Sequence, residues 1–281
     1  MLPNLLTEIL CCPDCRSDIT LAVEGNPACR ACGRSFAVDD GIISLLPLES
    51  KSLPSQYDDP DYRRMSERFD DSSPYFTDGN SVFRTIHESS HIATAAWEAK
   101  WPADGWTVDI GCGQGYHWPF VPNRTRLIGL DIRMESLRKI RARFPDAILI
   151  QGNLLALPFK HEAIARATSI YALEHIYWLD DALMEIARIL KPHAHFLVGL
   201  PCEGGLAWKT GRKLTSERTM SKRYNVDYRK YIALEHCNTA AKIERGLTKD
   251  FVAIERRLFP LPFIPAIGAN LTLSLALQKR T

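Results

Sequence analysis

Three glycines at alternate positions follow a short apolar segment near the middle of the chain. Gly111, Gly113 and Gly115 come directly after Val108–Ile110, which contains the acidic residue Asp109. Glycine lets a backbone turn sharply and approach a ligand closely, because no Cβ stands in the way. The spacing predicts a strand that ends in a loop built to hold a small ligand.

A second acidic residue stands about twenty positions after the first glycine, where a nucleotide-binding fold uses a carboxylate to bond ribose hydroxyls. This residue is Asp131, directly after a second expected strand over 126–130. A dinucleotide fold needs a small residue at position 116, where helix and strand close, but the chain has Tyr116. The pattern favours a ligand with an α-ammonium group, which suits Asp109, over one with a pyrophosphate. A dehydrogenase is the competing class of enzyme.

Five of the eight cysteines lie close to the start of the chain. Four of them form two C-x2-C pairs separated by thirteen residues, Cys12 with Cys15 and Cys29 with Cys32. Two such pairs can place four thiolates around one tetrahedral ion, so we expect one structural zinc ion. Iron is the alternative metal, and reduced structural or redox thiols are the alternative without a metal. We expect the fifth cysteine, Cys11, to be a small buried residue.

The elements that position these residues alternate between strands and helices, and a doubly wound α/β sheet follows from that alternation. We expect strands over 108–110, 126–130, 148–152, 168–171 and 195–200, and helices over 81–100, 180–191 and 232–247. Residues 251–259 and 270–277 predict a closing antiparallel pair, since the leucines of the second segment alternate with small or polar residues.

The helix expected over 81–100 has one apolar face, which carries Val82, Ile86, Ile92, Ala96 and Trp97. His87 and His91 stand four positions apart on the same helix. That spacing can hold a metal, but no third ligand is evident nearby. We therefore expect two solvated or capping histidines.

The glycine loop and the segments after it resemble the class I S-adenosylmethionine (SAM) dependent methyltransferases of the type-11 subgroup, over roughly residues 81–281. Residues 109–115 are similar to the first motif, D-x-G-x-G-x-G, and residues 172–176 to the fourth. Residues 148–159 look like the third motif, with Asn153 where the family has Asp. The family has Lys-Pro-Gly-Gly where this chain has Lys-Pro-His-Ala at 191–194.

This resemblance implies a Rossmann-like sheet of seven strands with a terminal antiparallel hairpin, and SAM as the methyl donor. It implies cofactor-binding residues in the loops after the strands: Asp109, Gly111, Cys112, Gly113, Gln114, Gly115, Asp131, Ile132, Asn153, Leu154 and Tyr171. The amide oxygen of Asn153 can still accept a bond from the adenine amino group. His175 or Glu174 would serve as base or acceptor anchor beside the methyl group, unless His175 packs against the adenosine or caps the next helix.

Residues 5–48 resemble the small zinc-binding proteins that activate tRNA and release-factor methyltransferases, on their two cysteine pairs and the segment 35–47. We therefore expect a zinc-binding domain over 1–48, a linker and helical cap over 49–104, and a methyltransferase domain over 105–281 with a lid insert at about 202–231. The resemblance implies an activating role for the first domain. Its three basic and six acidic residues favour a structural or activating role over a grip on phosphates.

Charge is distributed unevenly, although the whole chain carries only +2. Between Lys209 and Lys230, eight basic residues face two acidic ones, which gives the lid a local +6. A charge run is usually a solvated face, but beside an active site it favours an anionic acceptor. Because the first third of the chain is acidic, we favour a small-molecule, glycan or lipid acceptor over rRNA or tRNA. A non-catalytic SAM-binding or scaffold module is a further alternative.

The composition, the first ten residues and the uncharged segment 258–277 indicate where in the cell the protein is expected. The chain is 46% hydrophobic and 24% charged, which is typical of a soluble globular protein and excludes disorder. The first ten residues lack the basic flank and cleavage site of a signal peptide. Residues 258–277 carry no charge, but three prolines and strand periodicity argue against a transmembrane helix. We therefore expect a cytoplasmic protein without a transmembrane segment.

Overall fold

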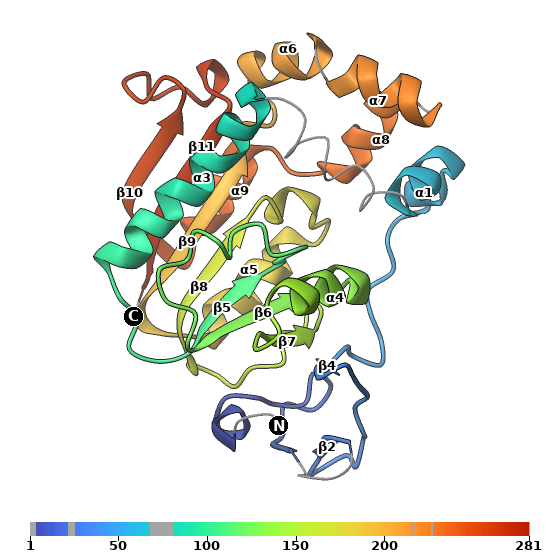
Figure 1. The fold of residues 1–281 in the computed structure, drawn as a ribbon, viewed down its shortest axis with the longest axis vertical. Coiled ribbons are helices and arrows are strands. Elements are labelled where there is room, and N and C mark those ends of the chain that lie inside the picture. The colour runs from blue at the N-terminus through green and yellow to red at the C-terminus, as the bar shows by residue number, and fades with distance from the viewer. Residues whose placement is uncertain (1–3, 22–25, 68–80, 215, 226, 281) are drawn as a thin grey trace.

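The computed structural model describes residues 4–21, 26–67, 81–214, 216–225 and 227–280. Its central feature is a sheet that, within these residues, contains nine strands in the order β10-β11-β9-β8-β5-β6-β7-β4-β3 (Figure 1). A second sheet contains β1 (Ile19–Thr20) and β2 (Ala28–Cys29). None of the described helices is both long enough and apolar enough to cross a bilayer.

Seven strands of the large sheet form the expected Rossmann-like unit: β5 (Thr107–Ile110), β6 (Leu127–Asp131), β7 (Ile148–Gln151), β8 (Ile164–Ile170), β9 (Leu190–Pro201), β10 (Phe251–Phe259) and β11 (Thr272–Lys279). The first five run parallel, and β11 is antiparallel to both β9 and β10. The predicted doubly wound sheet with a terminal hairpin is therefore confirmed. In β9, His193 has φ 61°, so this position takes the left-handed conformation that glycine takes readily.

The remaining two strands of this sheet come from the front of the chain, after η1 (Asn4–Glu8) and the small sheet. The hairpin of β3 (Val38–Asp39) and β4 (Ile42–Ser44) joins it because β4 runs parallel to β7, with Ile43 opposite Ile150. Leu6, Leu10 and Phe36 share one buried core with the strands. The front segment, at the bottom of Figure 1, therefore covers the β7 edge of the sheet.

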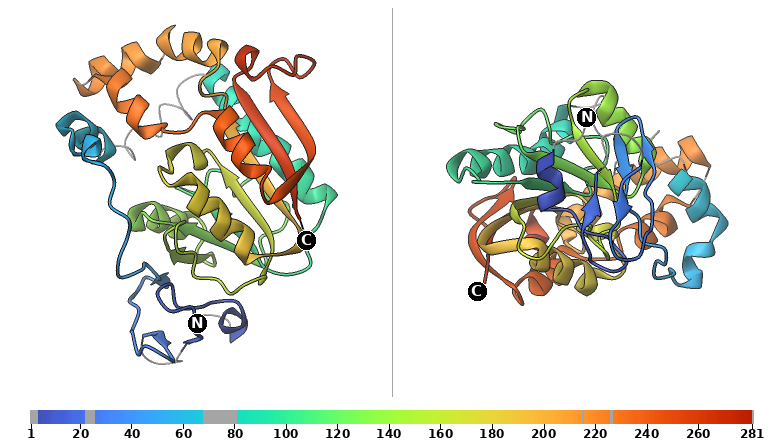
Figure 2. Two further views of the ribbon diagram at one scale, coloured as in Figure 1. Left: turned by 180° about the vertical axis from the view of Figure 1, so that it is seen from behind. Right: turned by 90° about the horizontal axis from the view of Figure 1, so that it is seen from below.

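Helices cover both faces of the sheet (Figures 1 and 2). One face is packed by α3 (Ser81–Lys100) and α4 (Met134–Arg143), and the opposite face by α5 (Leu179–Ile189) and α9 (Ala240–Leu247). The short 3-10 turn η3 (Leu173–His175) lies between β8 and α5, and η4 (Ile267–Ala269) lies between β10 and β11. Because the strands are covered on both sides, their ends and the loops after them are the parts left to form a site.

The apolar face predicted for α3 is partly wrong, although the helix bounds are right. Ile92 is 55% exposed and Ala96 is also exposed, whereas Trp97 is fully buried. The helix packs closely through small residues: a Cβ on Gly199 of β9 would lie 2.8 Å from the Cβ of Ser90. The side chain of Val82 lies outside the described residues.

The single helix predicted over 232–247 is two helices, α8 (Tyr228–Glu235) and α9. The chain breaks between them because Asn238 is drawn away, donating from Nδ2 to the carbonyls of Leu173 and Ile176 at 3.0 and 2.7 Å. Thr239 then caps α9 by accepting a hydrogen bond from the amide of Lys242.

A lid lies above the carboxyl ends of the parallel strands and consists of α6 (Leu206–Leu214), α7 (Ser216–Tyr224) and α8 (Figure 1). The segment predicted as linker and cap, residues 49–104, contains η2 (Ser55–Asp58), α1 (Pro60–Glu67) and α3, and its residues 68–80 lie outside the described residues. Because α3 packs on the sheet, only η2 and α1 form the cap. Tyr57 donates a hydrogen bond from its hydroxyl to the carbonyl of Leu234, and Asp59 pairs with Lys230. The cap is thus fastened to α8 of the lid.

Candidate active site and metal centre

The glycine loop after β5 is shaped by the lack of side chains at its glycines, and Gly115 lies where a Cβ would meet Ile140 Cγ1 at 2.9 Å. Gly111 has φ 69°, and a Cβ there would lie 2.6 Å from the Cβ of Ala172, so the loop packs tightly against the segment after β8. Gly113 has φ 50°, but a Cβ there would meet no heavy atom within 4 Å among the described residues. Gly111 is thus required for packing, whereas Gly113 leaves open space in which a ligand can approach the backbone.

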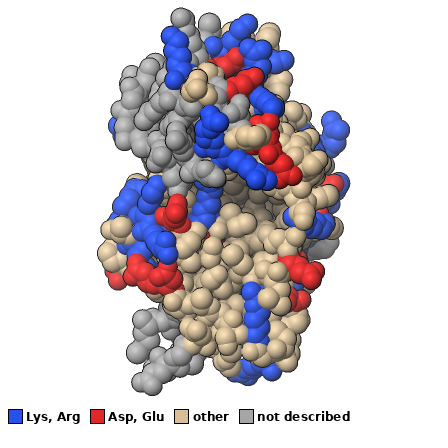
Figure 3. Space-filling view, turned by 90° about the vertical axis from the view of Figure 1, so that its right-hand side faces the viewer, with Lys and Arg blue, Asp and Glu red and all other residues tan. Residues whose placement is uncertain are grey.

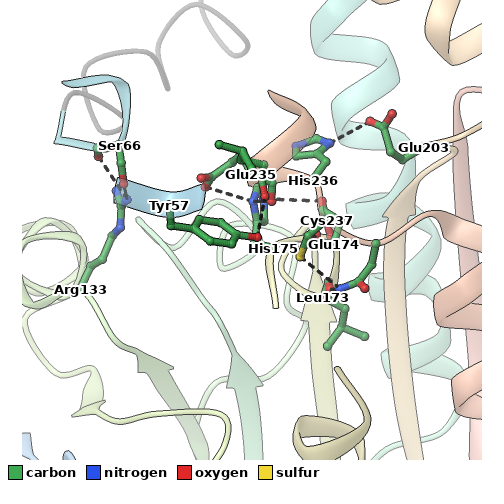
Figure 4. Close-up of polar contacts among 12 residues, drawn as sticks. Tyr57, Ser66, Arg133, Leu173, Glu174, His175, Glu203, Glu235, His236 and Cys237 are labelled. Carbon is green, nitrogen blue, oxygen red and sulfur yellow. Dashed lines mark hydrogen bonds and ion pairs between the residues drawn. The ribbon is translucent and has the colours of Figure 1, made fainter. Parts of the chain in front are cut away.

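Asp131, at the end of β6, is held by backbone amides from two loops. Its Oδ2 accepts from the amide of Gly113 at 2.8 Å and its Oδ1 from the amide of Arg133 at 2.9 Å. The Arg133 guanidinium also donates to the carbonyl of Ser66 in the cap (Figure 4). The contact of Asp131 with ribose hydroxyls stays a prediction. Its neighbour Ile132 is 53% exposed.

Asp109 and Cys112, both predicted to bind the cofactor, have buried side chains. Asp109 accepts a hydrogen bond at Oδ2 from Nε1 of Trp118 at 3.0 Å, and burial raises the pKa of its carboxyl to about 6. The Cys112 sulfur would lie 3.2 Å from a Cβ on Gly129, so it points into the core. The contact of Asp109 with an ammonium group stays a prediction.

Asn153 follows β7 at the same edge of the sheet and is 9% exposed. Its Oδ1 accepts from the amide of Leu155 at 2.9 Å, and its Nδ2 donates to Oγ of Ser50 at 3.4 Å. A carbonyl oxygen has two lone pairs, so the oxygen keeps one acceptor site for an adenine amino group. Leu154 beside it is buried. The predicted adenine contact is therefore compatible with these bonds.

His87 and His91 of α3 face the glycine loop, so the prediction of solvated or capping histidines is wrong. The ring centroid of His87 lies 5.0 Å from that of Tyr116 and 4.9 Å from that of Tyr171. Burial lowers the pKa of His87 to about 4, so its ring is neutral at neutral pH. Within the described part of the chain, His87 Nδ1 and His91 Nε2 are buried without a hydrogen-bond partner. Such orphaned nitrogens suit a polar ligand beside the loop.

His91 also belongs to a buried polar row beneath the loop that the sequence did not reveal. Its Nδ1 lies 3.4 Å from Nδ1 of His117, whose Nε2 is 3.6 Å from Oε2 of Glu98. Arg166 of β8 lies 3.7 Å from the other oxygen of Glu98. No local motif relates these residues, because three separate elements bring them together.

Tyr171 directly follows β8 in a strained conformation with φ 56°. Its hydroxyl donates to the carbonyl of His87 at 3.0 Å, and its amide donates to Gly199 of β9 at 2.9 Å. The turn η3 follows at once and carries both candidate catalytic residues, Glu174 and His175. The structure therefore places all three predicted residues at the carboxyl end of β8.

His175 lies between two carboxylates. Its Nδ1 is 3.2 Å from Oε1 of Glu235 in α8, and its Nε2 is 3.8 Å from Oε1 of Glu174 (Figure 4). Burial alone would lower the pKa of His175, but the bond to Glu235 and the charge of Glu174 outweigh it and raise that pKa to about 9. Burial works against Glu235 as well, yet the His175 bond lowers the pKa of this carboxyl to about 2. The imidazole is therefore charged at neutral pH.

Glu174 differs from Glu235 because burial dominates its surroundings. The residue is 1% exposed and burial raises the pKa of its carboxyl. Its Oε2 has no hydrogen-bond partner among the described residues. The site thus contains one fixed cation and one buried carboxylate that can take a proton or a hydrogen bond from a ligand.

His236 and Glu203 complete this cluster and were not predicted. Nδ1 of His236 is 2.9 Å from Oε2 of Glu203, and its ring lies edge-on to that of His175 at 4.8 Å. Glu174, His175 and His236 offer metal-ligand atoms within 4.8 Å of one another. The pairs that orient both imidazoles account for this geometry without a metal, so we describe the cluster as an acid–base network.

The four predicted cysteines come together at the front of the chain. Cys15 Sγ lies 3.4 Å from Cys29 Sγ, Cys12 Sγ lies 3.9 Å from Cys32 Sγ, and all four sulfurs lie within 4.8 Å of one another. Zinc–sulfur bonds of about 2.3 Å in a tetrahedron require sulfurs about 3.8 Å apart. The donor set fits one structural zinc ion, which would crosslink the two turns. Cys11 is 1% exposed, as predicted.

Two family models match the chain in separate places. Residues 108–198 match a methyltransferase domain, and residues 4–41 match the Trm112p-like proteins. These ranges contain the glycine loop with the candidate active site and the four cysteines, respectively.

The similar curated proteins agree with the methyltransferase match. A probable S-adenosylmethionine-dependent methyltransferase of Mycolicibacterium smegmatis is 30% identical over 95 residues, 34% of this chain and 37% of the relative. The 2-phytyl-1,4-naphtoquinone methyltransferase of Synechocystis is 27% identical over 141 residues, 47% of this chain and 56% of the relative. The chain thus spans between about a third and just over half of the length of these relatives.

The fold is similar to that of the N-methyltransferase NodS from Bradyrhizobium japonicum, solved with S-adenosyl-L-homocysteine, with TM-score 0.54 and 14% identity over 79% of this chain and 100% of that one. The chain therefore joins a Trm112p-like domain to a methyltransferase domain with the Rossmann-like fold.

Proposed function

We propose that this protein is a SAM-dependent methyltransferase whose acceptor binds over Glu174. The observation that carries the proposal is the meeting of three features at one edge of the sheet. Gly113 leaves open space beside its backbone, Asp131 is fixed by the amide of Gly113, and Glu174 is buried with an oxygen that has no partner among the described residues. Ligands of open α/β sheets bind at this edge.

The residues around the glycine loop suit the parts of SAM, which supplies an activated methyl group when bound. Asp131 would accept the ribose hydroxyls and Asn153 the adenine amino group. The orphaned nitrogens of His87 and His91 lie beside the loop, where they can meet the polar amino-acid end of the cofactor. Holding donor and acceptor in line is the main demand of a methyl transfer.

Glu174 is the better candidate for the base, and His175 for a positioning residue. An imidazole with a pKa of about 9 already holds its proton at neutral pH, so it cannot readily accept another. The Glu174 carboxylate has a raised pKa and a free acceptor oxygen within the described part of the protein. The Glu174 carboxylate can take a proton or a hydrogen bond from the acceptor. The charged His175 beside it holds this carboxylate in position and favours its ionised form.

Fewer cations of the lid can bind a polyanion such as RNA than its local charge of +6 suggests. Three of its cations are paired, Arg212 with Glu203, Arg229 with Glu217 and Lys230 with Asp59. Figure 3 shows acidic side chains interspersed among basic ones over this part of the surface. We therefore favour a small-molecule, glycan or lipid acceptor over RNA. One relative is named for a naphthoquinone.

The Trm112p-like domain has a structural or activating role in this proposal. Its strand β4 extends the sheet, and Leu45 donates from its amide to the carbonyl of Gln151 at 2.8 Å. The domain thereby removes an open edge and covers apolar side chains of the catalytic unit. Boundaries at residues 48 and 104 remain predictions.

Calorimetry with SAM and with NAD tests the proposal. The protein should bind SAM and not NAD, and Asp131→Ala should abolish binding, whereas Glu135→Ala, an exposed acidic residue nearby on α4, should not. No binding at about millimolar SAM would contradict the methyltransferase, and binding of NAD alone would favour a dehydrogenase. Labelled SAM incubated with total RNA and with lipid and glycolipid fractions then separates the acceptor classes.

A further inference from the structure

The connection between β10 and β11 is an exposed apolar loop. Residues 260–266, Pro-Leu-Pro-Phe-Ile-Pro-Ala, are all exposed and carry no charge. Phe263 is 96% exposed, and Leu261 and Ile264 are 43% exposed each. Large apolar side chains that gather on a surface mark a site for a partner or a membrane.

This loop is held from its inner side. The buried Asn270 accepts at Oδ1 from the amide of Leu261 at 2.7 Å and donates from Nδ2 to the carbonyls of Ile264 and Ala266 at 3.1 and 3.2 Å. Arg256 donates to the carbonyl of Pro265 at 3.1 Å. All of these bonds use backbone atoms of the loop, so its apolar side chains are left facing outward in a preformed shape.

The start of α6 lies against the same loop and adds both apolar surface and positive charge. A Cβ on Gly205 would lie 3.0 Å from the carbonyl oxygen of Ile267, and the next residue, Leu206, is 74% exposed. Lys209 and Lys213 follow at helical spacing, are exposed, and form no ion pair within the described part of the chain. They contrast with the paired cations elsewhere in the lid.

This apolar tip lies at the same edge of the sheet as the candidate active site (Figure 1). Phe259, the last residue of β10, pairs with Thr272, and Thr272 pairs with Pro201 at the end of β9. Glu203, which orients His236, follows two residues later. A surface that contacted the loop would therefore face the edge at which the acceptor enters.

We propose that loop 260–266 and the exposed face of α6 dock this protein on an anionic lipid bilayer. Phe263 and its apolar neighbours would enter the boundary between headgroups and acyl chains, and Lys209 and Lys213 would meet anionic headgroups. An uncharged loop held by hydrogen bonds, beside lysines that form no ion pair among the described residues, is complementary to such a surface in both polarity and charge. One short loop gives weak and reversible binding. Resting on the proposed function, this docking identifies the acceptor as a lipid-soluble molecule.

Vesicle flotation of the full chain tests the docking. The protein should float with vesicles of phosphatidylcholine containing about 30% phosphatidylglycerol. Phe263→Ser should lower the partition coefficient about tenfold or more, and Lys209→Glu with Lys213→Glu should remove the dependence on the anionic lipid. Met184→Ser, an exposed apolar residue on α5, and Lys191→Glu, an exposed lysine at the start of β9, are the matched controls and should float like the unchanged protein.

Two results would overturn the docking. The first is that the unchanged protein does not float with the vesicles. The second is that the Phe263→Ser variant floats as well as the unchanged protein. A protein that stays off vesicles but whose oligomeric state changes with Phe263→Ser would show a contact between copies instead. Calorimetry with SAM without vesicles keeps the two proposals apart: SAM binding without flotation refutes the docking alone, and flotation without SAM binding refutes the methyltransferase alone.

Discussion

Nδ1 of His175 lies 3.2 Å from Oε1 of Glu235, and this ion pair joins the turn after β8 to helix α8 of the lid. The two residues stand 60 positions apart in the chain, yet each shifts the other's protonation. The lid is therefore attached to the methyltransferase domain by a charge pair whose strength depends on pH.

Stability should fall as pH rises above neutrality because of this pair. The pKa of His175 is raised from 6.5 to about 9 in the folded protein. Its contribution to the free energy of unfolding is therefore complete below pH 6.5 and is lost as the pH rises through 9. The pKa of Glu235 is lowered from 4.5 to about 2, so its contribution is complete above 4.5 and is lost as pH falls through 2. Both contributions are complete between about pH 4.5 and 6.5.

His175→Gln should thus lower the free energy of unfolding by on the order of 3 kcal/mol near pH 6, and by much less above pH 9. Urea unfolding at both pH values measures the difference. His161→Gln changes an exposed histidine and should leave the stability unchanged at both. An equal loss at the two pH values would show that His175 acts through packing and not through charge.

Glu174→Gln should reduce turnover by about 10²- to 10⁴-fold while the dissociation constant for SAM stays unchanged. The amide keeps the shape of the side chain but cannot accept a proton. In the unchanged protein, kcat should rise with pH through the raised pKa of Glu174, since only the ionised form is a base, and the substitution should remove that rise. Glu135→Gln is the control. Full turnover of Glu174→Gln would exclude this residue as the base.

Cys15→Ser should lower the metal content below one ion per chain and unfold the front domain, because zinc binding to such a site contributes on the order of 10 kcal/mol. Cys11→Ala removes a buried thiol outside the cluster and should keep the full metal content. Elemental analysis of the purified proteins measures both, and it also distinguishes zinc from iron. Equal metal content in the two variants would contradict the four-cysteine site.

Ile43→Ala should destabilise the protein by about 2–5 kcal/mol, since Ile43 is fully buried at the junction of β4 with β7. Val38→Ala, at an exposed position of the same hairpin, should cost far less. Thermal unfolding of the two variants measures the difference.

Deletion of residues 1–48 should cost solubility or SAM affinity. A truncated protein that binds SAM normally and loses only acceptor affinity would show that this domain binds the acceptor instead.

The parts of the fold that local spacing encodes were predictable. The two cysteine pairs and the alternate glycines can be recognised within a few residues, and Asp131 by its distance of twenty positions from Gly111. The structure brings the four sulfurs together, and it places the glycines directly after β5 and Asp131 at the end of β6. The break at Asn238 was missed because its cause is distant: the carbonyls of Leu173 and Ile176, which recruit its side chain. Thr239 is a residue type that often begins a helix, so the sequence does contain one local indication that a new helix starts there.

Contacts between the lid, the cap and the site were not predictable for the same reason. Glu235 and His236 look like the middle of a helix, and only the folded chain brings them to Glu174 and His175. The basic residues of the lid give a local charge of +6 in the sequence, which does not show that Lys230 pairs with Asp59, 171 positions away. Residue types therefore indicated the kind of chemistry, whereas tertiary packing determined which groups are ionised and free.

Gly113→Ala should abolish SAM binding and leave the protein folded. Gly113 has φ 50° and open space where a Cβ would stand, so the methyl group costs about 1–2 kcal/mol of backbone strain but causes no internal clash. It would instead occupy the space in which a ligand approaches the loop. Gly33→Ala is the matched control, because Gly33 has φ 72° and equally open surroundings but lies near the cysteines. Both variants should show a similar small loss in melting temperature, and only Gly113→Ala should lose the calorimetric signal of SAM. Similar SAM affinity in the two variants would show that the ligand does not lie against this glycine.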